Sequence, residues 1–248
     1  MAEIWFYILV GFVAQLVDGA LGMAYGLIAT SLLLSMGVTP ATASATVHAA
    51  EVFTTGFSAF SHHYFGNIDK ALFRRLLLPG MIGAAIGAYL LASLSGDLVK
   101  PFIAVYLIIL GGVVVIKAFR EFPPTAVTRH VAPLGFFGAL VDAIGGGGWG
   151  PIVASTLLAR GSHARLTVGT VNAVEFFVTL TASVVFIATL GLMNWKIILG
   201  LALGGMLAAP VGAVIVKKIP VRPLMFLVGF LIMGLSGLLL YRTISPHL

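Results

Sequence analysis

Two carboxyl groups lie in the middle of apolar segments that are long enough to cross a bilayer, and each has a polar neighbour three residues earlier. Glu51 follows His48, and Glu175 follows Asn172. An i, i+3 spacing places both side chains of a pair on one helical face. Ionisable groups are costly at membrane depth, so they indicate a functional site by default. We interpret these pairs as groups that hold or carry an ion during transport.

The acids recur at a fixed interval along the chain. Moving 124 positions from Glu51 gives Glu175, and the same shift takes Asp18 to Asp142. About 18 of the 50 positions from residue 11 to residue 60 are identical to their partners, far above chance for an internal repeat. The sequence therefore predicts a first repeat at 1–120, a linker at 121–130 and a second repeat at 131–248, which together form one transport domain.

The composition is that of an integral membrane protein. The chain is 60% hydrophobic and only 9% charged, whereas soluble domains carry about 25% charged residues. The absence of cysteine excludes disulfides and thiol chemistry. The formal charge of +6 comes from basic residues in short loops between apolar segments, where they set membrane orientation and do not indicate nucleic-acid binding.

Two of the eight apolar segments are interrupted. The first contains Gly19, Gly22 and Gly26, and the fifth contains the run Gly145-Gly-Gly-Gly-Trp-Gly-Pro151. Glycine disfavours helical order and proline removes a hydrogen-bond donor, so both runs favour unwinding. The pieces on either side are about 10 to 15 residues long, as expected of re-entrant half-helices. Each half of this all-α protein is therefore predicted to contain one broken or re-entrant segment and three transmembrane helices.

The positions of the basic residues distinguish two arrangements of the repeats. If both broken segments return to their starting side, 11 of the 14 Lys and Arg residues lie on one side of the membrane; if both segments cross, the split is 8 to 6. Basic residues concentrate on the cytoplasmic side, which favours the first arrangement. That arrangement makes the halves inverted repeats with both termini outside. Eight plain helices in parallel repeats are the alternative.

The glycine-rich breaks are candidate anion sites. Unwound backbone exposes N–H groups, and the helix that follows points its positive dipole end at the gap. No Lys or Arg lies within the cores of the broken segments. We predict these substrate-binding residues: Gly22, Tyr25, Gly26, Gly146, Gly147, Gly148, Trp149, Thr170 and Asn172. The alternative is that glycines allow close helix packing, which we expect for Gly83 and Gly87.

The coupling residues are predicted to be Asp18, His48, Glu51, Asp142 and Glu175. A charge at the bilayer centre costs about 2.5–3.5 kcal/mol, and protonating an ordinary carboxylate at pH 7 costs about 4 kcal/mol. Because the two costs are close, Glu51 and Glu175 can exchange a proton during transport. The alternatives are permanently neutral glutamates bonded to neighbouring helices, and for His48 an ordinary hydrogen bond between helices.

Enzymatic chemistry has little support in the sequence. His48 and Glu51 have the spacing of metal ligands, but the second repeat has Asn172 in place of the histidine, and no His-Glu-x-x-His motif is present. We expect no enzymatic activity, no cofactor and no resident metal.

Several motifs together resemble one known family. They are the paired glycine-rich breaks, the run Asp142 to Pro151, Val168-Gly-Thr-Val-Asn172, and Gly66-Asn-Ile-Asp69 followed by Leu78-Pro-Gly-Met-Ile-Gly-Ala. Over nearly the whole chain the sequence resembles the sulfite exporter TauE/SafE family. The resemblance implies a multi-pass permease of the bacterial inner membrane that moves sulfite, sulfonates or related anions, usually outward. The first half departs from the family at Asp18-Gly-Ala-Leu-Gly-Met-Ala24, which lacks the usual triple glycine.

The sequence therefore predicts a secondary transporter that exports a small sulfur-containing anion, sulfite or an organosulfonate, with a proton as a candidate coupling ion. Its expected partners are the anion, the lipid bilayer and a proton or sodium ion. Nucleic acid is not expected as a partner, and a homodimer is left open. The alternative is a cation- or proton-coupled permease that imports a small organic solute, which the four acids favour.

Overall fold

The computed structural model describes residues 2–21, 23–119, 130–160, 164–191, 194–215 and 221–245, and all regular structure in these residues is helical. The first half contains α1 (Ala2–Leu21), α2 (Tyr25–Ser35), α3 (Pro40–Tyr64), α4 (Lys70–Ser93) and α5 (Gly96–Ala118). The second half contains α6 (Val131–Gly145), the π-helix η1 (Gly150–Ala154), α7 (Ser155–Ala159), α8 (Ala164–Leu190), α9 (Trp195–Ile215) and α10 (Val221–Ile244). The predicted all-α class is confirmed.

The helices of the two halves correspond along the chain. Shifting the bounds of α3 by 124 residues gives 164–188, and α8 occupies Ala164–Leu190. Shifting α5 by 125 residues gives 221–243, and α10 occupies Val221–Ile244. Both breaks fall where glycine interrupts the apolar segments, after α1 and after α6. α1 is longer than the predicted half-helix, because it continues for 20 residues, whereas α2 has 11 and α6 has 15.

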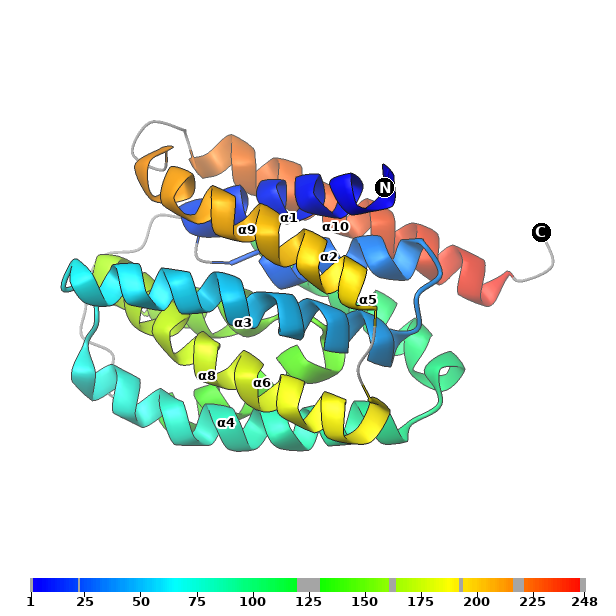
Figure 1. Ribbon diagram of the computed structural model, residues 1–248, viewed down its shortest axis with the longest axis horizontal. Coiled ribbons are helices and arrows are strands. Elements are labelled where there is room, and N and C mark those ends of the chain that lie inside the picture. The colour runs from blue at the N-terminus through cyan, green and yellow to red at the C-terminus, as the bar shows by residue number, and fades with distance from the viewer. Residues whose placement is uncertain are drawn as a thin grey trace.

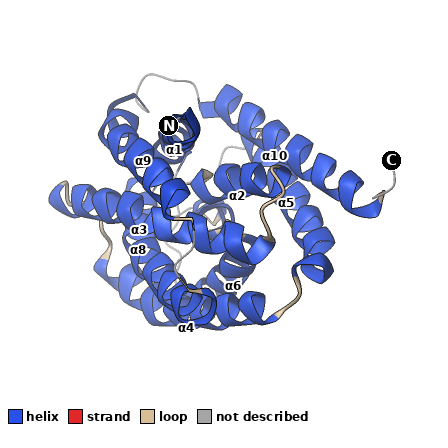
Figure 2. Ribbon diagram, turned by 45° about the vertical axis from the view of Figure 1, so that its right-hand side comes forward, coloured by secondary structure: helices blue, strands red, loops and turns tan. Residues whose placement is uncertain are grey.

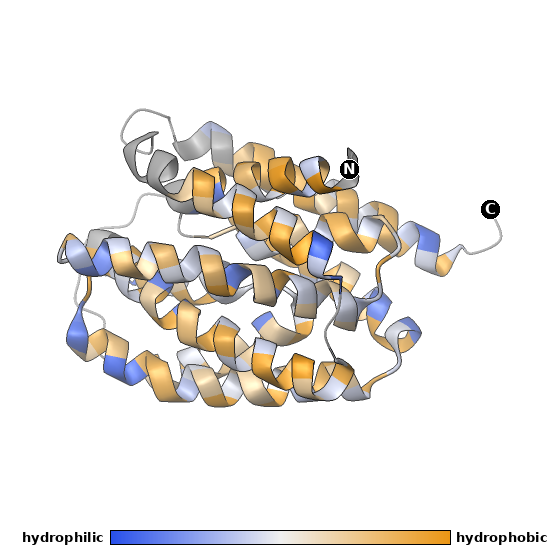
Figure 3. Cartoon of the chain, in the orientation of Figure 1, coloured by the Kyte–Doolittle hydropathy of each residue, from blue (hydrophilic) through white to orange (hydrophobic). Residues whose placement is uncertain are grey.

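Four helical stretches are long and apolar enough to cross a membrane: Lys70–Ser93, Gly96–Ala118, Leu166–Leu190 and Met225–Ile244. Shorter apolar helices lie at Ile4–Asp18, Tyr25–Ser35, Val131–Gly145 and Trp195–Ala209. Figure 3 shows hydrophobic residues along the sides of the helices and hydrophilic residues gathered toward the two ends of the bundle. The protein is therefore embedded in a membrane.

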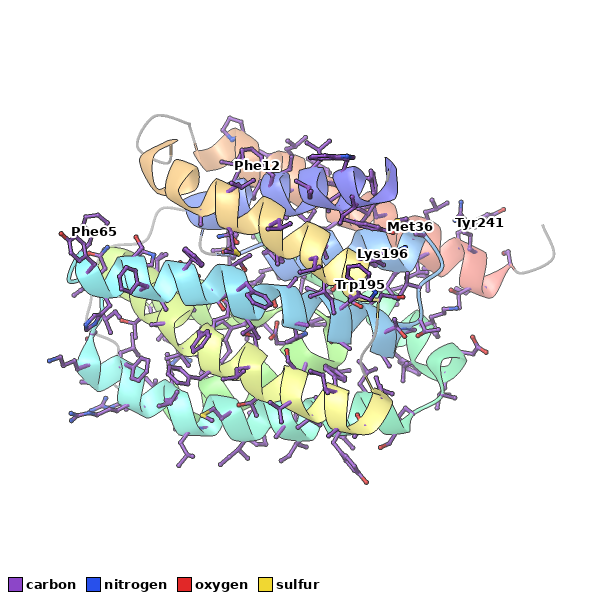
Figure 4. All side chains as sticks on the ribbon, in the orientation of Figure 1. Phe12, Met36, Phe65, Trp195, Lys196 and Tyr241 are labelled. Atoms are coloured by element: carbon purple, nitrogen blue, oxygen red, sulfur yellow. The ribbon has the colours of Figure 1, made fainter. Side chains whose placement is uncertain are left out.

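Large apolar side chains are exposed at both ends of the bundle, as expected where a membrane meets water. Phe65 lies at one end, and Trp195 and Tyr241 lie at the other (Figure 4). Their side chains are 61%, 62% and 56% exposed, respectively.

The two halves are interlocked by equivalent helix pairs. α1 packs along α9, and their counterparts α6 and α4 pack along each other. α3 packs on α8, and α5 packs on α10. A Cβ at Gly83 would meet the carbonyl of Phe136 in α6, and one at Gly87 would meet the carbonyl of Leu140. The packing role predicted for these two glycines is confirmed.

Corresponding helices run in opposite directions along the long axis. Figure 1 shows α3 running from right to left and α8 from left to right. Figure 2 shows α2 close to the centre of the bundle, with the longer helices around it. Most of α2 is buried, and it packs against α1, α3 and α10. The short helices that follow the breaks are thus the elements around which the site is built.

Candidate functional site

A small cavity lies where the two breaks meet. It is lined by four acids from four helices: Asp18, Glu51, Asp142 and Glu175. The remaining lining comes from the two breaks and the turns that follow them: Met23, Ala24, Tyr25, Gly26, Leu27, Gly147, Gly148, Gly150 and Pro151. Only about 10 Å³ is open to the centre of a water molecule, which is room for about one water. This arrangement, in which the cavity is too small for a larger ion, is called the closed form below.

The backbones of the two breaks are in direct contact. A Cβ at Gly147 would lie 2.5 Å from both the carbonyl carbon of Gly26 and the nitrogen of Leu27. A Cβ at Gly26 would lie 2.8 Å from Cα of Gly147 and 3.0 Å from Oε1 of Glu51. No side chain fits at either position without moving backbone, so glycine is required where the two halves touch.

Asp142 organises the second break. Its carbonyl oxygen accepts from the N–H groups of Gly146 (2.8 Å) and Gly147 (3.2 Å), and its Oδ1 accepts from the N–H of Trp149 (2.9 Å). Asp18 makes the equivalent contact in the first break, where Oδ1 lies 3.4 Å from the N–H of Tyr25. In each half a carboxylate seven residues upstream therefore caps the helix that follows. Three N–H groups expected to hold an anion are occupied by the protein itself.

Tyr106 of α5 holds the same break from outside and was not found by sequence reasoning. Its hydroxyl donates to the carbonyl of Gly147 at 3.0 Å. The C=O and N–H of one trans peptide point in opposite directions, so this bond turns the N–H of Gly148 away from α5. That N–H has no hydrogen-bond partner within the described part of the chain. Gly148 therefore supplies a free donor in the lining of the cavity.

His48 joins the two halves through Asp142. Its Nε2 lies 3.2 Å from Oδ2 of Asp142, and its Nδ1 lies 2.8 Å from the carbonyl of Ser44. A carbonyl oxygen only accepts, so Nδ1 carries a hydrogen, and Nε2 and the carboxyl group share one further proton. The spacing along α3 pairs His48 with Glu51, but the structure gives it Asp142 as its partner. The hydroxyl of Ser44 strengthens the same junction, because it donates to the carbonyl of Ala143 at 2.6 Å.

The two glutamates face the cavity without a bond to a neighbouring helix. Glu51 is 4% exposed and Glu175 is half-buried. In the described residues neither carboxyl group has a side-chain hydrogen-bond partner. A glutamate kept permanently neutral by a neighbouring helix would need such a partner. Among the described residues both carboxyl groups are therefore left open to the cavity.

Trp149 and Gly146 of the second break were predicted to bind substrate, but neither belongs to the cavity lining. Trp149 is fully buried, and its indole N–H donates to the carbonyl of Val171 at 3.1 Å, so the ring does not wall the cavity. Its counterpart Tyr25 does line the cavity. Gly146 ends α6 with a left-handed backbone and accepts a hydrogen bond from the hydroxyl of Thr30. The predicted residue Gly22 lies outside the described residues.

Thr170 and Asn172, the other predicted binding residues, also lie outside the cavity lining. The hydroxyl of Thr170 accepts from the N–H of Asp69 at 2.8 Å, which secures the start of α4. The side-chain amide of Asn172 donates to the carbonyl of Val168 in its own helix at 3.0 Å. Both are ordinary bonds for buried polar groups on helices. No three acids, histidines or cysteines among the described residues could share a metal ion.

Replacing Tyr106 with phenylalanine tests its hold on the break. The ring would still fill the space beside Gly145, but the Gly147 carbonyl would lose its donor. One neutral hydrogen bond contributes about 0.5–1.5 kcal/mol, so we expect substrate affinity to fall by up to about tenfold. The measurement is substrate binding to the purified protein beside a melting curve. If the Tyr106→Phe protein binds substrate with unchanged affinity but melts at a lower temperature, the contact of Tyr106 with Gly147 is purely structural.

A small cavity lined by ionisable groups, at the meeting point of broken helices in a membrane-embedded bundle, is the arrangement of a membrane transporter. Residues 7–239 match the model of the family described as Sulfite exporter TauE/SafE, so the chain belongs to that family. The chain is 44% identical over 239 residues to the Probable membrane transporter protein YtnM of Bacillus subtilis (strain 168). The match covers 92% of this chain and 80% of that relative. No solved structure matches the chain.

Proposed function

We propose that this membrane transporter exports a small sulfur-containing anion, sulfite or an organosulfonate, across the bacterial inner membrane together with a proton. The observation that carries the proposal is a cavity whose lining joins both glycine breaks to four acids. The name of the family supports sulfite or a related anion as the substrate. The free N–H of Gly148 gives such an anion a donor in the cavity lining.

Electrostatics link the proton to the anion. Two like charges 4 Å apart repel by about 4 kcal/mol at an effective dielectric constant of 20. An anion therefore cannot share so small a space with four ionised carboxyl groups, and its binding needs protons on the acids. By linkage, proton binding then favours anion binding to the same extent. The anion and at least one proton cross together, and the net direction follows the gradients of both.

We also infer that the two halves are inverted repeats in the membrane. The opposite directions of α3 and α8 support this arrangement, and so does the concentration of basic residues on one side (Figure 1). On this basis the loop at Phe65 is cytoplasmic and the loop at Trp195 is outside. In parallel repeats of eight spanning helices, both loops would lie on the same side.

Single cysteines test this topology cleanly, because the chain has none of its own. We expect an impermeant thiol reagent on whole cells to label Trp195→Cys but not Phe65→Cys. Both positions are exposed at the helix ends, so permeabilised cells should label both and serve as the control. Equal labelling of the two variants in intact cells would reject inverted repeats.

A second candidate function has its own support. Among the described residues no Lys or Arg side chain belongs to the cavity lining, and Asp142 occupies N–H groups that an anion could otherwise use. These features suit a cation- or proton-coupled permease that imports a small organic solute. In that case a cation would bind among the acids, and the glycine breaks would serve only as hinges.

Thermal-shift screening of the purified protein separates the two functions. A ligand that binds only the folded state at 100 times its Kd stabilises it by about 2.7 kcal/mol. We expect stabilisation by sulfite or an organosulfonate in a panel of sulfite, sulfate, thiosulfate, sulfoacetate, taurine and sodium chloride. Stabilisation by sodium alone, with matched potassium as the control, would favour the second function.

A further inference from the structure

Lys117 places a positive charge beside the acid-lined cavity. It lies in the last turn of α5, and its Nζ donates to the carbonyl of Pro151 at 3.0 Å. Pro151 belongs to the cavity lining and to the first turn of the π-helix η1. By sequence Lys117 is only a basic residue near the linker, whereas its side chain is partly buried and extends toward the site.

The ammonium group of Lys117 has no carboxylate partner among the residues that the structure describes. Within the described residues no carboxylate oxygen lies within 4.0 Å of it. Of its three N–H donors, one is used on a neutral carbonyl. A partly buried charge without an opposite charge is unfavourable. A bound anion would supply the missing partner.

One face of α5 presents two polar groups to the second break. Tyr106 and Lys117 are 11 residues apart, which is about three helical turns. Tyr106 holds the carbonyl of Gly147, and Lys117 holds the carbonyl of Pro151. Between these carbonyls lies Gly148, whose N–H is free within the described part of the chain. The segment from Gly147 to Pro151 therefore carries a free backbone donor and has the positive charge of Lys117 beside it.

The equivalent residue of the other half makes a different contact. Arg242 is 125 residues after Lys117, the interval that relates α5 to α10. Its guanidinium donates to the carbonyl of Ser35 at 3.2 Å, at the far end of α2, and the side chain is exposed. Arg242 is thus an ordinary cation at a helix C-terminus, and of this pair only Lys117 reaches a residue of the cavity lining.

We propose that Lys117 is a substrate-binding residue, which receives the negatively charged oxygens of a small sulfur oxyanion next to Gly148. The inference rests on the proposed function and adds the cationic group that an acid-lined cavity lacks. In the closed form the ammonium group lies on the Pro151 carbonyl. When the breaks separate, its two free donors and the N–H of Gly148 hold the anion while the acids take up protons.

Sulfite binding to the purified protein, measured by isothermal titration calorimetry, tests this role. We expect Lys117→Gln to weaken sulfite binding at least about tenfold, as removal of a charge-assisted hydrogen bond does. Lys117→Arg should restore most of the affinity, and Arg242→Gln should bind like the wild type. If the wild type binds no sulfite, the proposed function fails. If the wild type and Lys117→Gln bind sulfite equally, Lys117 is not a binding residue.

Chemical footprinting of the wild type gives the same answer without a variant that could fail to fold. Sulfite should slow the modification of Lys117 by an amine reagent, as measured by peptide mass spectrometry. Lys196, exposed at the opposite end of the bundle (Figure 4), is the internal control and should react at the same rate with and without sulfite. A rate at Lys117 that does not change at saturating sulfite would overturn the proposal.

Discussion

Alanine at position 147 is expected to reduce transport by about 100-fold or more, the loss that a displacement near 1 Å can cause in a preorganised site. The added Cβ would lie 2.5 Å from two backbone atoms at the start of α2. A flexible side chain could move aside, but backbone at the contact between two breaks cannot. The second break must therefore shift, and the acids and the N–H of Gly148 then no longer line one cavity in the same arrangement. The measurement is sulfite efflux from proteoliposomes at equal protein density.

Two other glycines serve as controls for this substitution. Gly234 in α10 has nothing within 4 Å of an added Cβ, so Gly234→Ala should transport normally. Gly87→Ala would press on the carbonyl of Leu140 and should lower the melting temperature first. Normal efflux by a folded Gly147→Ala protein would show that the contact between the breaks is not part of the transport site.

Asp142→Asn is expected to keep one role of Asp142, which is to cap the helix that follows the second break, and to remove the other, which is to exchange a proton with His48. The amide oxygen can still accept from the N–H of Trp149, so the break should keep its shape. The amide cannot share a titrating proton with His48, however. Groups that transfer protons typically contribute about 100-fold or more, and we expect proton-coupled flux to fall to that extent while anion binding is retained.

Asp18→Asn is the matched variant in the other half. Asp18 caps Tyr25 as Asp142 caps Trp149, but the position equivalent to His48 is Asn172, which bonds within its own helix. We therefore expect a smaller loss from Asp18→Asn. Proteoliposomes with a pH-sensitive dye inside measure both variants. Equal losses in the two would mean that the His48–Asp142 pair has no special part in moving the proton.

The breaks and their acids could be predicted because the signals are local and repeated. Long glycine-rich runs favour a break in a helix, and the 124-residue shift pairs Asp18 with Asp142 by their positions in the chain alone. A residue's partner across helices leaves no such signal. His48 bonds a carboxyl group 94 positions away, although Glu51 is closer in sequence. Only packing decides between the two.

Residues that bond across the bundle were the hardest to place. The sequence does not show which carbonyl Tyr106 or Lys117 reaches. Thr170 was expected in the site because its neighbours resemble a family motif. Its hydroxyl instead holds the start of α4, a contact between residues 101 positions apart. Polar groups on a helix can bond locally or across the bundle, and their spacing alone does not tell which.

The central claim is that a sulfur oxyanion and a proton cross together through the acid-lined cavity. Proteoliposomes loaded with sulfite and a pH-sensitive dye test it directly, with protein-free liposomes as the background. We predict that sulfite efflux through the wild type makes the interior more alkaline, and that the Glu51→Gln, Glu175→Gln double variant loses this change. Sulfite efflux above background with no change of internal pH would contradict the claim.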